Sequence, residues 1–201
     1  GAIGDPKYDN NPKAKVRPEQ GLLRMRKALG LFANLRPVTV YEPLVDRSPL
    51  KADVVRGTDF ICVRELTSGI YFGRQGRDRH DTRAYDTCTY TIDEILTDEA
   101  RVISGSLGML SSASIGAKCA LFEPVHGSYP QAAGKDIANP MAAVLSAALL
   151  LEHLGLGAEG RAVRKAIDRT LAAGVVTEDL TAPGQRSYRT SAVGDFIAAQ
   201  I

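Results

Sequence analysis

An apolar run at residues 141–154, MAAVLSAALLLEHL, constrains the fold of this chain more than any other segment. Asn139 suits an N-cap and Pro140 suits the first helical position, so the sequence predicts a helix over 141–154. Apolar residues surround this helix on most sides. Such a helix lies either in the core of a layered fold or at a subunit interface, and the sequence leaves both places open.

The rest of the chain mixes helical and strand-like patterns. Apolar periodicity predicts further helices, with Gly30 ending the first, over residues 19–29, 93–102, 158–173 and 190–199. Runs of β-branched and aromatic residues predict strands over residues 38–41, 59–64, 70–72 and 118–122, with 83–91 as the second arm of a hairpin. The small residues at 105–116 predict a loop. Strands mixed with helices in this way indicate the α/β class.

Composition and charge exclude several classes of function. The chain has 25 Lys and Arg against 23 Asp and Glu, a net charge of +2, so it has no global field that would draw it to nucleic acid or anionic lipid. Its longest apolar run, at 142–151, is shorter than the roughly 20 residues that cross a bilayer. The 3 isolated cysteines and the absence of a secretory pattern in residues 1–20 predict a cytoplasmic protein.

Three segments place an arginine beside apolar or strand-like residues. They are EQGLLRMR at 19–26, LFANLRP at 31–37 and VRELTSGIY at 63–71, and they carry Arg26, Arg36 and Arg64. An arginine next to an apolar strand is costly to bury unless an anion meets it. Each arginine taken singly is most simply part of a surface salt bridge. The three together predict a carboxylate-binding site.

Longer strings around these arginines carry a family resemblance. They are ExxLLxxR at 19–26, LFANLRP at 31–37, VRELTxGIYFG at 63–73, GSLGMLxSAS at 105–114, and FEPVHGSxP followed by AGKxIANP within 122–140. In these strings the chain resembles the 3-isopropylmalate dehydrogenases, which are β-decarboxylating dehydrogenases of leucine biosynthesis. The resemblance implies an incomplete α/β/α fold of that type and a homodimer. It also implies a discontinuous first domain over 1–31 and 105–201 and a shortened second domain over 32–104.

The resemblance implies roles for the substrate side of the site. Arg26, Arg36 and Arg64 match the arginines that clamp two substrate carboxylates, a task that suits the planar guanidinium. Glu19, Leu22 and Leu23 match the residues that meet the isopropyl group. Tyr71 matches the tyrosine that helps to protonate the enol after CO2 leaves.

The resemblance also implies an NAD site and a metal site. His126, Gly127, Ser128 and Asn139 match the loop that binds the adenosine half of NAD, whereas Gln131 stands where many relatives have an aspartate that contacts the ribose. Because glutamine does not repel a 2′-phosphate as a carboxylate does, the choice between NAD and NADP stays open. Asp98 matches a metal-binding aspartate, and Glu94 stands one helical turn earlier. Carboxylates at i and i+4 share a helix face and can offer oxygen ligands to Mg2+ or Mn2+.

Parts of the family pattern have no counterpart here. The resemblance begins inside the pattern, which implies an N-terminally truncated chain that lacks the opening strand and a glycine turn of the nicotinamide site. After Tyr90 and Thr91 the sequence passes directly to 92–98, where relatives carry a long part of the second domain. That part holds the catalytic lysine, a further metal aspartate and the dimerising arm. The sequence therefore predicts an internal deletion and identifies no general base.

The implied activity is NAD-dependent oxidative decarboxylation of 3-isopropylmalate to 2-oxoisocaproate, impaired in the chain as written. One alternative is a related β-decarboxylating dehydrogenase that acts on tartrate, malate or another 2-hydroxy diacid, although Leu22 and Leu23 speak against it. The other is a noncatalytic, internally deleted paralogue that binds nucleotide or partner chains.

Overall fold

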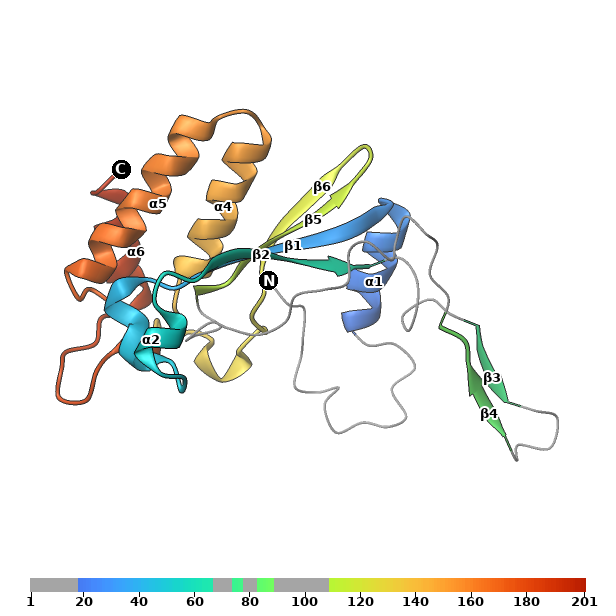
Figure 1. Cartoon of the computed structure of the whole chain (residues 1–201), viewed down its shortest axis with the longest axis horizontal. Helices are drawn as coiled ribbons and strands as arrows, with labels where there is room; N and C mark the ends of the chain where they lie inside the picture. The colour runs from blue at the N-terminus through green and yellow to red at the C-terminus, as the bar shows by residue number, and fades with distance from the viewer. Residues whose placement is uncertain (1–17, 67–73, 78–82, 89–108) are drawn as a thin grey trace.

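A computed structural model describes residues 18–66, 74–77, 83–88 and 109–201. Within these ranges a four-stranded sheet lies beside a group of helices, and a short separate hairpin extends from the opposite side (Figure 1). The elements around the sheet are α1 (Pro18–Ala28), β1 (Leu31–Thr39), β2 (Asp59–Glu65), β5 (Ser111–Gly116) and β6 (Ala120–Pro124). The helical group is formed by α4 (Met141–His153), α5 (Gly157–Ala172) and α6 (Thr190–Ala198). Four short helical segments lie in the connections between these elements: η2 (Glu42–Arg47), α2 (Ala52–Val55), η5 (Pro130–Ala132) and η6 (Glu178–Leu180).

The sheet is antiparallel throughout, with the strand order β2-β1-β5-β6. Asn34 on β1 lies opposite Arg64 on β2 and opposite Ser114 on β5, and Ser112 lies opposite Glu123 on β6. Because side chains alternate along a strand, all of these residues share one face of the sheet. We call this the polar face of the sheet.

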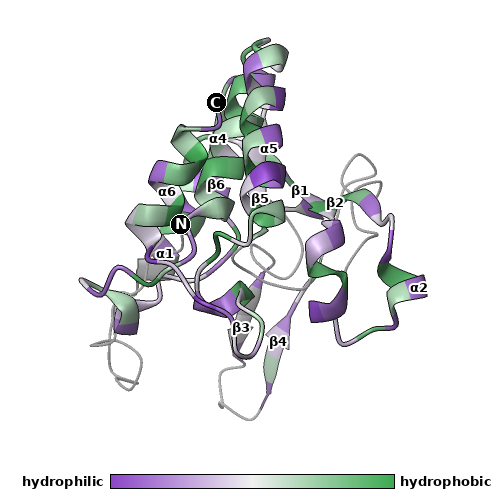
Figure 2. Cartoon of the chain, turned by 90° about the vertical axis from the view of Figure 1, so that its left-hand side faces the viewer, coloured by the Kyte–Doolittle hydropathy of each residue, from purple (hydrophilic) through white to green (hydrophobic). Residues whose placement is uncertain are grey.

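The other face of the sheet is largely apolar, and α4 covers the part of it that β5 and β6 form. This helix packs against β5 and β6, and the Phe122 ring of β6 lies 5.4 Å from the ring of His153. A continuous core runs from α4 into α5 and α6, and it includes Met141, Leu145, Ile167 and Ile197. Figure 2 shows α4 as predominantly hydrophobic, whereas α5 carries hydrophilic residues along one side. The sheet therefore gains its stability from one face and keeps the other for polar side chains.

The predicted helices agree with the structure wherever it describes them. Helices α1, α4, α5 and α6 match the ranges expected from periodicity, and Gly30 ends the first of them in the left-handed region at φ 62°. The predicted cap of α4 is wrong by one residue: Pro140, not Asn139, occupies the N-cap, and Asn139 precedes it, with its Oδ1 accepting a hydrogen bond of 3.0 Å from the backbone N–H of Met141. One side of α4 stays uncovered in the single chain, where Leu150 is 39% and Leu154 is 63% exposed. The predicted helix at 93–102 lies outside the described residues.

Two predictions about the strands are wrong. The stretch 105–116 was expected to be a loop, yet Ser111–Gly116 forms the central strand β5, with Ser111 to Ser114 buried. Small side chains fit there because strands flank β5 on both sides, and neighbouring polar groups meet its serines. The strand expected at 38–41 instead begins at Leu31 and contains the LFANLRP string. Strand β2 confirms the expected 59–64, and β6 confirms 118–122 with a shift of two residues towards the C-terminus.

The hairpin prediction is half correct. Its second arm is β4 (Ala84–Asp86), within the expected 83–91, and it pairs with β3 (Gln75–Arg77), which lies outside the ranges in which the sequence predicts strands. The predicted strand at 70–72 lies outside the described residues. The division into domains over 1–31 with 105–201 and over 32–104 stays a prediction, and β1 from one proposed domain pairs with β5 from the other.

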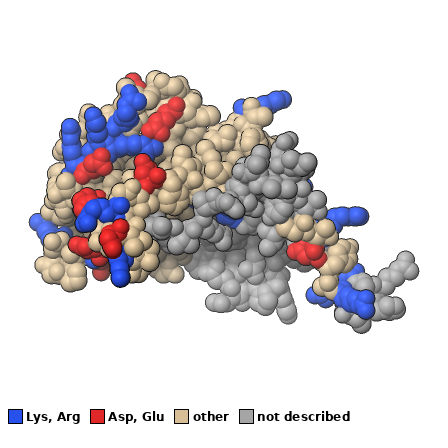
Figure 3. Space-filling view, in the orientation of Figure 1, with Lys and Arg blue, Asp and Glu red and all other residues tan. Residues whose placement is uncertain are grey.

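The helical part of the face seen in Figure 3 carries charged side chains of both signs. Lys and Arg side chains alternate there with Asp and Glu side chains. This distribution agrees with the small net charge of the whole sequence. None of the helices in the described ranges combines the length and hydrophobicity needed to span a membrane.

Candidate functional site

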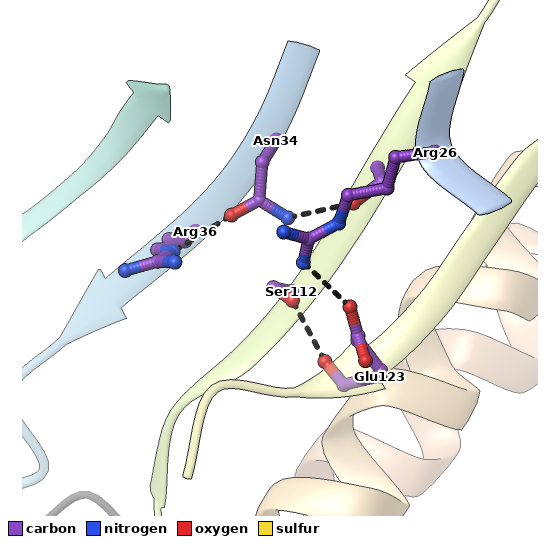
Figure 4. Close-up of polar contacts among 6 residues, drawn as sticks. Arg26, Asn34, Arg36, Ser112 and Glu123 are labelled. Atoms are coloured by element: carbon purple, nitrogen blue, oxygen red, sulfur yellow. Dashed lines mark hydrogen bonds and ion pairs between the residues drawn. The ribbon is translucent and has the colours of Figure 1, made fainter. Parts of the chain in front are cut away.

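Arg26 reaches from α1 onto the polar face of the sheet. Its Nη2 donates a hydrogen bond of 2.8 Å to Oε1 of Glu123, and the two side chains are only 12% and 9% exposed (Figure 4). The Nε of the same guanidinium is buried and has no hydrogen-bond partner within the described part of the chain. A buried donor without an acceptor costs about 1–3 kcal/mol, more when it is charged. Within the described residues the Arg26 guanidinium therefore has a paired group, Nη2, and an unpaired group, Nε.

Asn34 connects the strands beneath Arg26. It is fully buried; its Nδ2 donates to Ser114 Oγ at 3.0 Å, and its Oδ1 accepts from Arg36 Nε at 2.7 Å. Figure 4 shows Asn34 between the side chains of Arg26 and Arg36. On the neighbouring strand, Ser112 Oγ donates to the carbonyl oxygen of Glu123 at 2.8 Å. Satisfied polar groups of this kind hold a site in one arrangement.

The structure brings the three predicted arginines to the polar face. Arg36 follows Asn34 by two residues on β1, and Arg64 lies directly across from Asn34 on β2. Both are partly buried, and both take part in further interactions. Three guanidinium groups above a buried polar layer can bind an acid with two carboxylates, because the fork of each group matches carboxylate geometry.

Leu22 and Leu23 are partly buried on α1, and Leu22 precedes Arg26 by one helical turn. The side chain of Glu19 and the whole of Tyr71 lie outside what the structure describes, so the roles expected for them stay predictions. Sequence patterns do not identify Asn34 or Glu123, although both lie inside the strings that carry the family resemblance. Their polarity at strand positions was the available signal, since a buried polar residue in a strand needs a partner.

A separate pocket of about 800 Å³ lies where the loop after β6 meets the start of α4. All four residues predicted to bind the cofactor line it: His126, Gly127, Ser128 and Asn139. The other lining residues include Tyr129, in the left-handed region at φ 42°, and Ile137. A largely apolar pocket with a few polar groups is typical of a site for a small molecule or a cofactor.

Two carboxylates that sequence patterns did not identify complete the pocket wall. They belong to Glu178 and Asp179 in η6, far from the loop in sequence. Asn139 Nδ2 donates to Asp179 Oδ2 at 3.0 Å and Asn139 Oδ1 accepts from the backbone N–H of Met141, so Asn139 bonds both to η6 and to the first residue of α4. Gln131, which the resemblance aligned with a ribose-binding position, is exposed and is not among the described residues that line the pocket.

The loop of the pocket is also attached to α6. Asp136 adopts φ 55° and accepts hydrogen bonds from both the backbone N–H and the Oγ of Ser191, at 2.9 and 2.6 Å. These bonds lower the pKa of the Asp136 carboxyl below its ordinary value. The charged form of Asp136 thus stabilises the start of α6 and the loop together.

The predicted metal ligands Glu94 and Asp98 lie outside the described residues. Among the residues that are described, no group of three or more His, Cys, Asp or Glu side chains could hold a metal ion. The described residues therefore form two candidate binding sites: the arginines on the polar face and the pocket beside α4.

Comparisons with known proteins agree with the fold and with the motif strings. The family model described as isocitrate/isopropylmalate dehydrogenase matches residues 1–96 and 92–197. The 3-isopropylmalate dehydrogenase of Bacteroides fragilis (strain YCH46) is 39% identical over 280 positions, which cover 100% of this chain and 79% of that protein. The 3-isopropylmalate dehydrogenase of Anaeromyxobacter dehalogenans is 41% identical, over 90% of this chain and 75% of that protein.

Solved structures have the same fold. The isocitrate dehydrogenase from Methylococcus capsulatus superposes with a TM-score of 0.70 at 22% identity, covering 89% of this chain and 75% of that one. The β-decarboxylating dehydrogenase from Thermococcus kodakarensis has a TM-score of 0.63 at 26% identity, covering 89% and 71%. The chain thus has an incomplete α/β fold of the isocitrate/isopropylmalate dehydrogenase type.

The comparisons also bear out the internal deletion. The two segments matched by the family model meet at residues 92–96, where the sequence pattern predicted missing residues. The alignment with the Bacteroides protein runs over 280 positions whereas this chain has 201 residues, so at least 79 positions of that relative have no counterpart here. The family model matches the chain on both sides of this junction, and the Bacteroides protein aligns with all of it. The chain therefore belongs to the isocitrate/isopropylmalate dehydrogenase family, in agreement with the shared fold.

Proposed function

We propose that this chain is a shortened NAD-dependent 3-isopropylmalate dehydrogenase, whose reaction converts 3-isopropylmalate to 2-oxoisocaproate, and that its activity is impaired. The observation that carries the proposal is the buried Nε of Arg26, which has no partner within the described residues although Glu123 holds the Nη2 of the same group. A substrate carboxylate supplies the missing acceptor. The names of the relatives support the substrate, since several 36–41% identical proteins are 3-isopropylmalate dehydrogenases.

In this proposal Arg26, Arg36 and Arg64 bind and orient the two carboxylates of the substrate. Asn34 positions Arg36 through the bond of 2.7 Å, so the acceptor finds the guanidinium already oriented. Leu22 and Leu23, on the same helix as Arg26, meet the isopropyl group together with Glu19. Apolar contacts of this size favour isopropylmalate over malate or tartrate by about 1–3 kcal/mol.

The pocket beside α4 suits the adenosine half of NAD. Its volume of about 800 Å³ and its mixture of apolar and polar lining residues fit a cofactor of that size. When bound, NAD supplies the acceptor for the hydride of the hydroxyl-bearing carbon. His126, Ser128 and Asn139 offer hydrogen-bonding groups to it, and Gly127 leaves open space, since a Cβ there would have nothing within 4 Å.

The metal ligands and the role of Tyr71 rest on the family alone. Glu94 and Asp98 would offer oxygen ligands to Mg2+ or Mn2+, and Tyr71 would help to protonate the enol. A homodimer is supported by the uncovered side of α4, where Leu150 and Leu154 are exposed. The cytoplasm is the proposed location.

A second candidate is a noncatalytic paralogue that binds nucleotide or partner chains without turnover. The observation in its favour is the junction at residues 92–96, where relatives carry additional residues and where the family resemblance locates the catalytic lysine. The two candidates differ in turnover, while both retain a nucleotide pocket.

Titration calorimetry on the purified 201-residue chain tests the substrate site. We expect 3-isopropylmalate to bind more tightly than malate, and Arg26→Lys to weaken its binding about tenfold or more, because lysine cannot form the bidentate contact. The matched control is Arg56→Lys, which changes an arginine in an exposed ion pair with Glu42. Equal weakening by both variants, or equal affinity for both acids, would contradict the proposed pocket.

A further inference from the structure

One side of the pocket beside α4 is formed by a segment that has no secondary structure of its own. Ile137, Ala138 and Asn139 line the pocket, and residues 136–139 belong to no helix or strand. We call residues 136–139 the linking segment. Because a helix or sheet ladder does not fix its backbone, its position depends on hydrogen bonds to other parts of the chain.

The start of α6 supplies four of these bonds. Thr190 donates through its backbone N–H to the carbonyl oxygen of Asp136 at 2.9 Å, and through Oγ1 to the carbonyl oxygen of Ala138 at 2.6 Å. Ser191 donates through its backbone N–H and its Oγ to the two carboxylate oxygens of Asp136, at 2.9 and 2.6 Å. Two consecutive residues of α6 thus hold both ends of the stretch from Asp136 to Ala138.

The contact serves the helix as well as the linking segment. The N-cap residue of α6, Arg189, makes no capping hydrogen bond with its side chain. The Asp136 carboxylate accepts from the first turn of α6 instead, and a negative charge is favourable at a helix N-terminus. Asp136 adopts φ 55°, a conformation that aspartate tolerates better than most residues.

Helix α6 is itself firmly attached to the core, since Val193 is 0% and Ile197 is 2% exposed. A displacement of the linking segment therefore has to break its bonds to a packed helix. None of Asp136, Thr190 and Ser191 is among the described residues that line the pocket. They can affect a ligand only through the position of the residues between them and the pocket.

We infer that the start of α6 sets the affinity of this pocket for its ligand. The bonds from Ser191 to Asp136 hold the linking segment in the arrangement that binds an adenosine nucleotide, so Asp136 and Ser191 are positioning residues. The inference rests on the proposed function, because it assumes that the pocket holds the adenosine half of the cofactor. Coupling of this kind is reciprocal, so a bound nucleotide also stabilises the contact between α6 and the linking segment.

Calorimetric titration of the full 201-residue chain with 5′-AMP tests the inference. Asp136→Gly removes both carboxylate bonds, while glycine readily adopts the positive φ of this position. We expect this variant to bind 5′-AMP about fivefold more weakly or worse, and Ser191→Ala to show a smaller loss, since it keeps the backbone donor. Asp136→Asn should retain most of the affinity, because asparagine tolerates the same φ and keeps one side-chain oxygen as an acceptor.

A control variant separates positioning from a general loss of stability. Thr170 is fully buried in α5, and its Oγ1 donates to the carbonyl oxygen of Ala166 in the same helix at 2.7 Å. Thr170→Ala should lower the midpoint of thermal unfolding, yet it should leave the affinity for 5′-AMP unchanged in the folded protein. An equal loss of affinity in Thr170→Ala and Asp136→Gly would overturn the inference.

Hydrogen exchange tests the reciprocal effect without a variant. Saturating 5′-AMP should slow exchange of the Ser191 amide, which donates to Asp136 Oδ1, more than that of the Arg56 amide, which donates to the Ala52 carbonyl oxygen in α2. If 5′-AMP binds but Ser191 does not respond, or if folded Asp136→Gly binds it as tightly as the unsubstituted chain, the inference is overturned and the nucleotide pocket stands. If 5′-AMP does not bind to the unsubstituted chain, the proposed pocket fails, and the inference fails with it.

Discussion

Asn34 shows how much of the polar face depends on one residue. Its replacement by alanine removes the acceptor of Arg36 Nε and the donor to Ser114 Oγ, both in a buried setting. We expect Asn34→Ala to lower the free energy of unfolding by about 1–3 kcal/mol, because unpaired buried polar groups remain. Thr39→Ala is the control on the same strand; it loses only an exposed bond of 3.2 Å to Asp59 and should change stability by less than about 0.5 kcal/mol. Denaturant unfolding measures both, and similar losses would show that the network contributes little.

Single residues also show where sequence prediction succeeds and where it stops. The arginines and the four residues of the cofactor loop could be predicted because each lies in a distinctive string, and the structure brings each set together. Asn34 and Glu123 could not be assigned, since each has a partner that is distant in sequence. The ion pair between Arg26 and Glu123, for example, joins residues 97 positions apart. Pairings of that kind follow from the packing of strands, and periodicity contains no information about them.

At the scale of elements, the helices were predictable and the central strands were not. Helical periodicity repeats over three or more turns, so the sequence alone is enough to identify a helix. Strand β5 is short, rich in serine and buried on both sides, and such a segment has no alternating pattern.

The contact between α4 and α5 explains another feature: a Cβ at Gly160 would lie 2.7 Å from Glu152 Cγ and 3.1 Å from the Ala148 carbonyl oxygen. Glycine allows the two helices to approach closely at this point.

The same pair of helices carries a pH-dependent contact. Arg164 donates to Glu152 through Nε at 2.7 Å and through Nη2 at 2.9 Å, which lowers the pKa of Glu152 below its ordinary value of 4.5. A lowered carboxyl pKa contributes stability above the ordinary value, and this contribution is lost as the pH falls through the lowered value. We expect Glu152→Gln to cost about 0.2–1 kcal/mol at neutral pH, because the pair is partly exposed. Its unfolding curve should converge on that of the unsubstituted chain in acid. A difference that persists at low pH would mean that packing, and not charge, is responsible.

At the scale of the whole molecule, we expect the junction at residues 92–96 to limit activity. The polar face and the pocket are both present, whereas the family resemblance locates the catalytic lysine among the positions that have no counterpart in this chain. Loss of a general base lowers a rate by about 10²–10⁴. We therefore expect no measurable NADH formation when the purified chain is given NAD, Mn2+ and 3-isopropylmalate under conditions in which a full-length relative turns over. Turnover that Tyr71→Phe abolishes would show that another residue replaces the lysine.

The pairing of β1 with β5 has a consequence for how the chain closes on itself. These two strands come from opposite sides of the junction, so forming the centre of the sheet requires the ends of a long intervening segment to meet. The Bacteroides relative carries at least 79 further positions, and if these are assigned to the junction the segment between β1 and β5 is about half as long here as in that relative. Halving such a loop lowers the entropy cost of bringing its ends together by only about 0.6 kcal/mol. The stability of the central pairing should therefore depend little on the length of chain between its two strands.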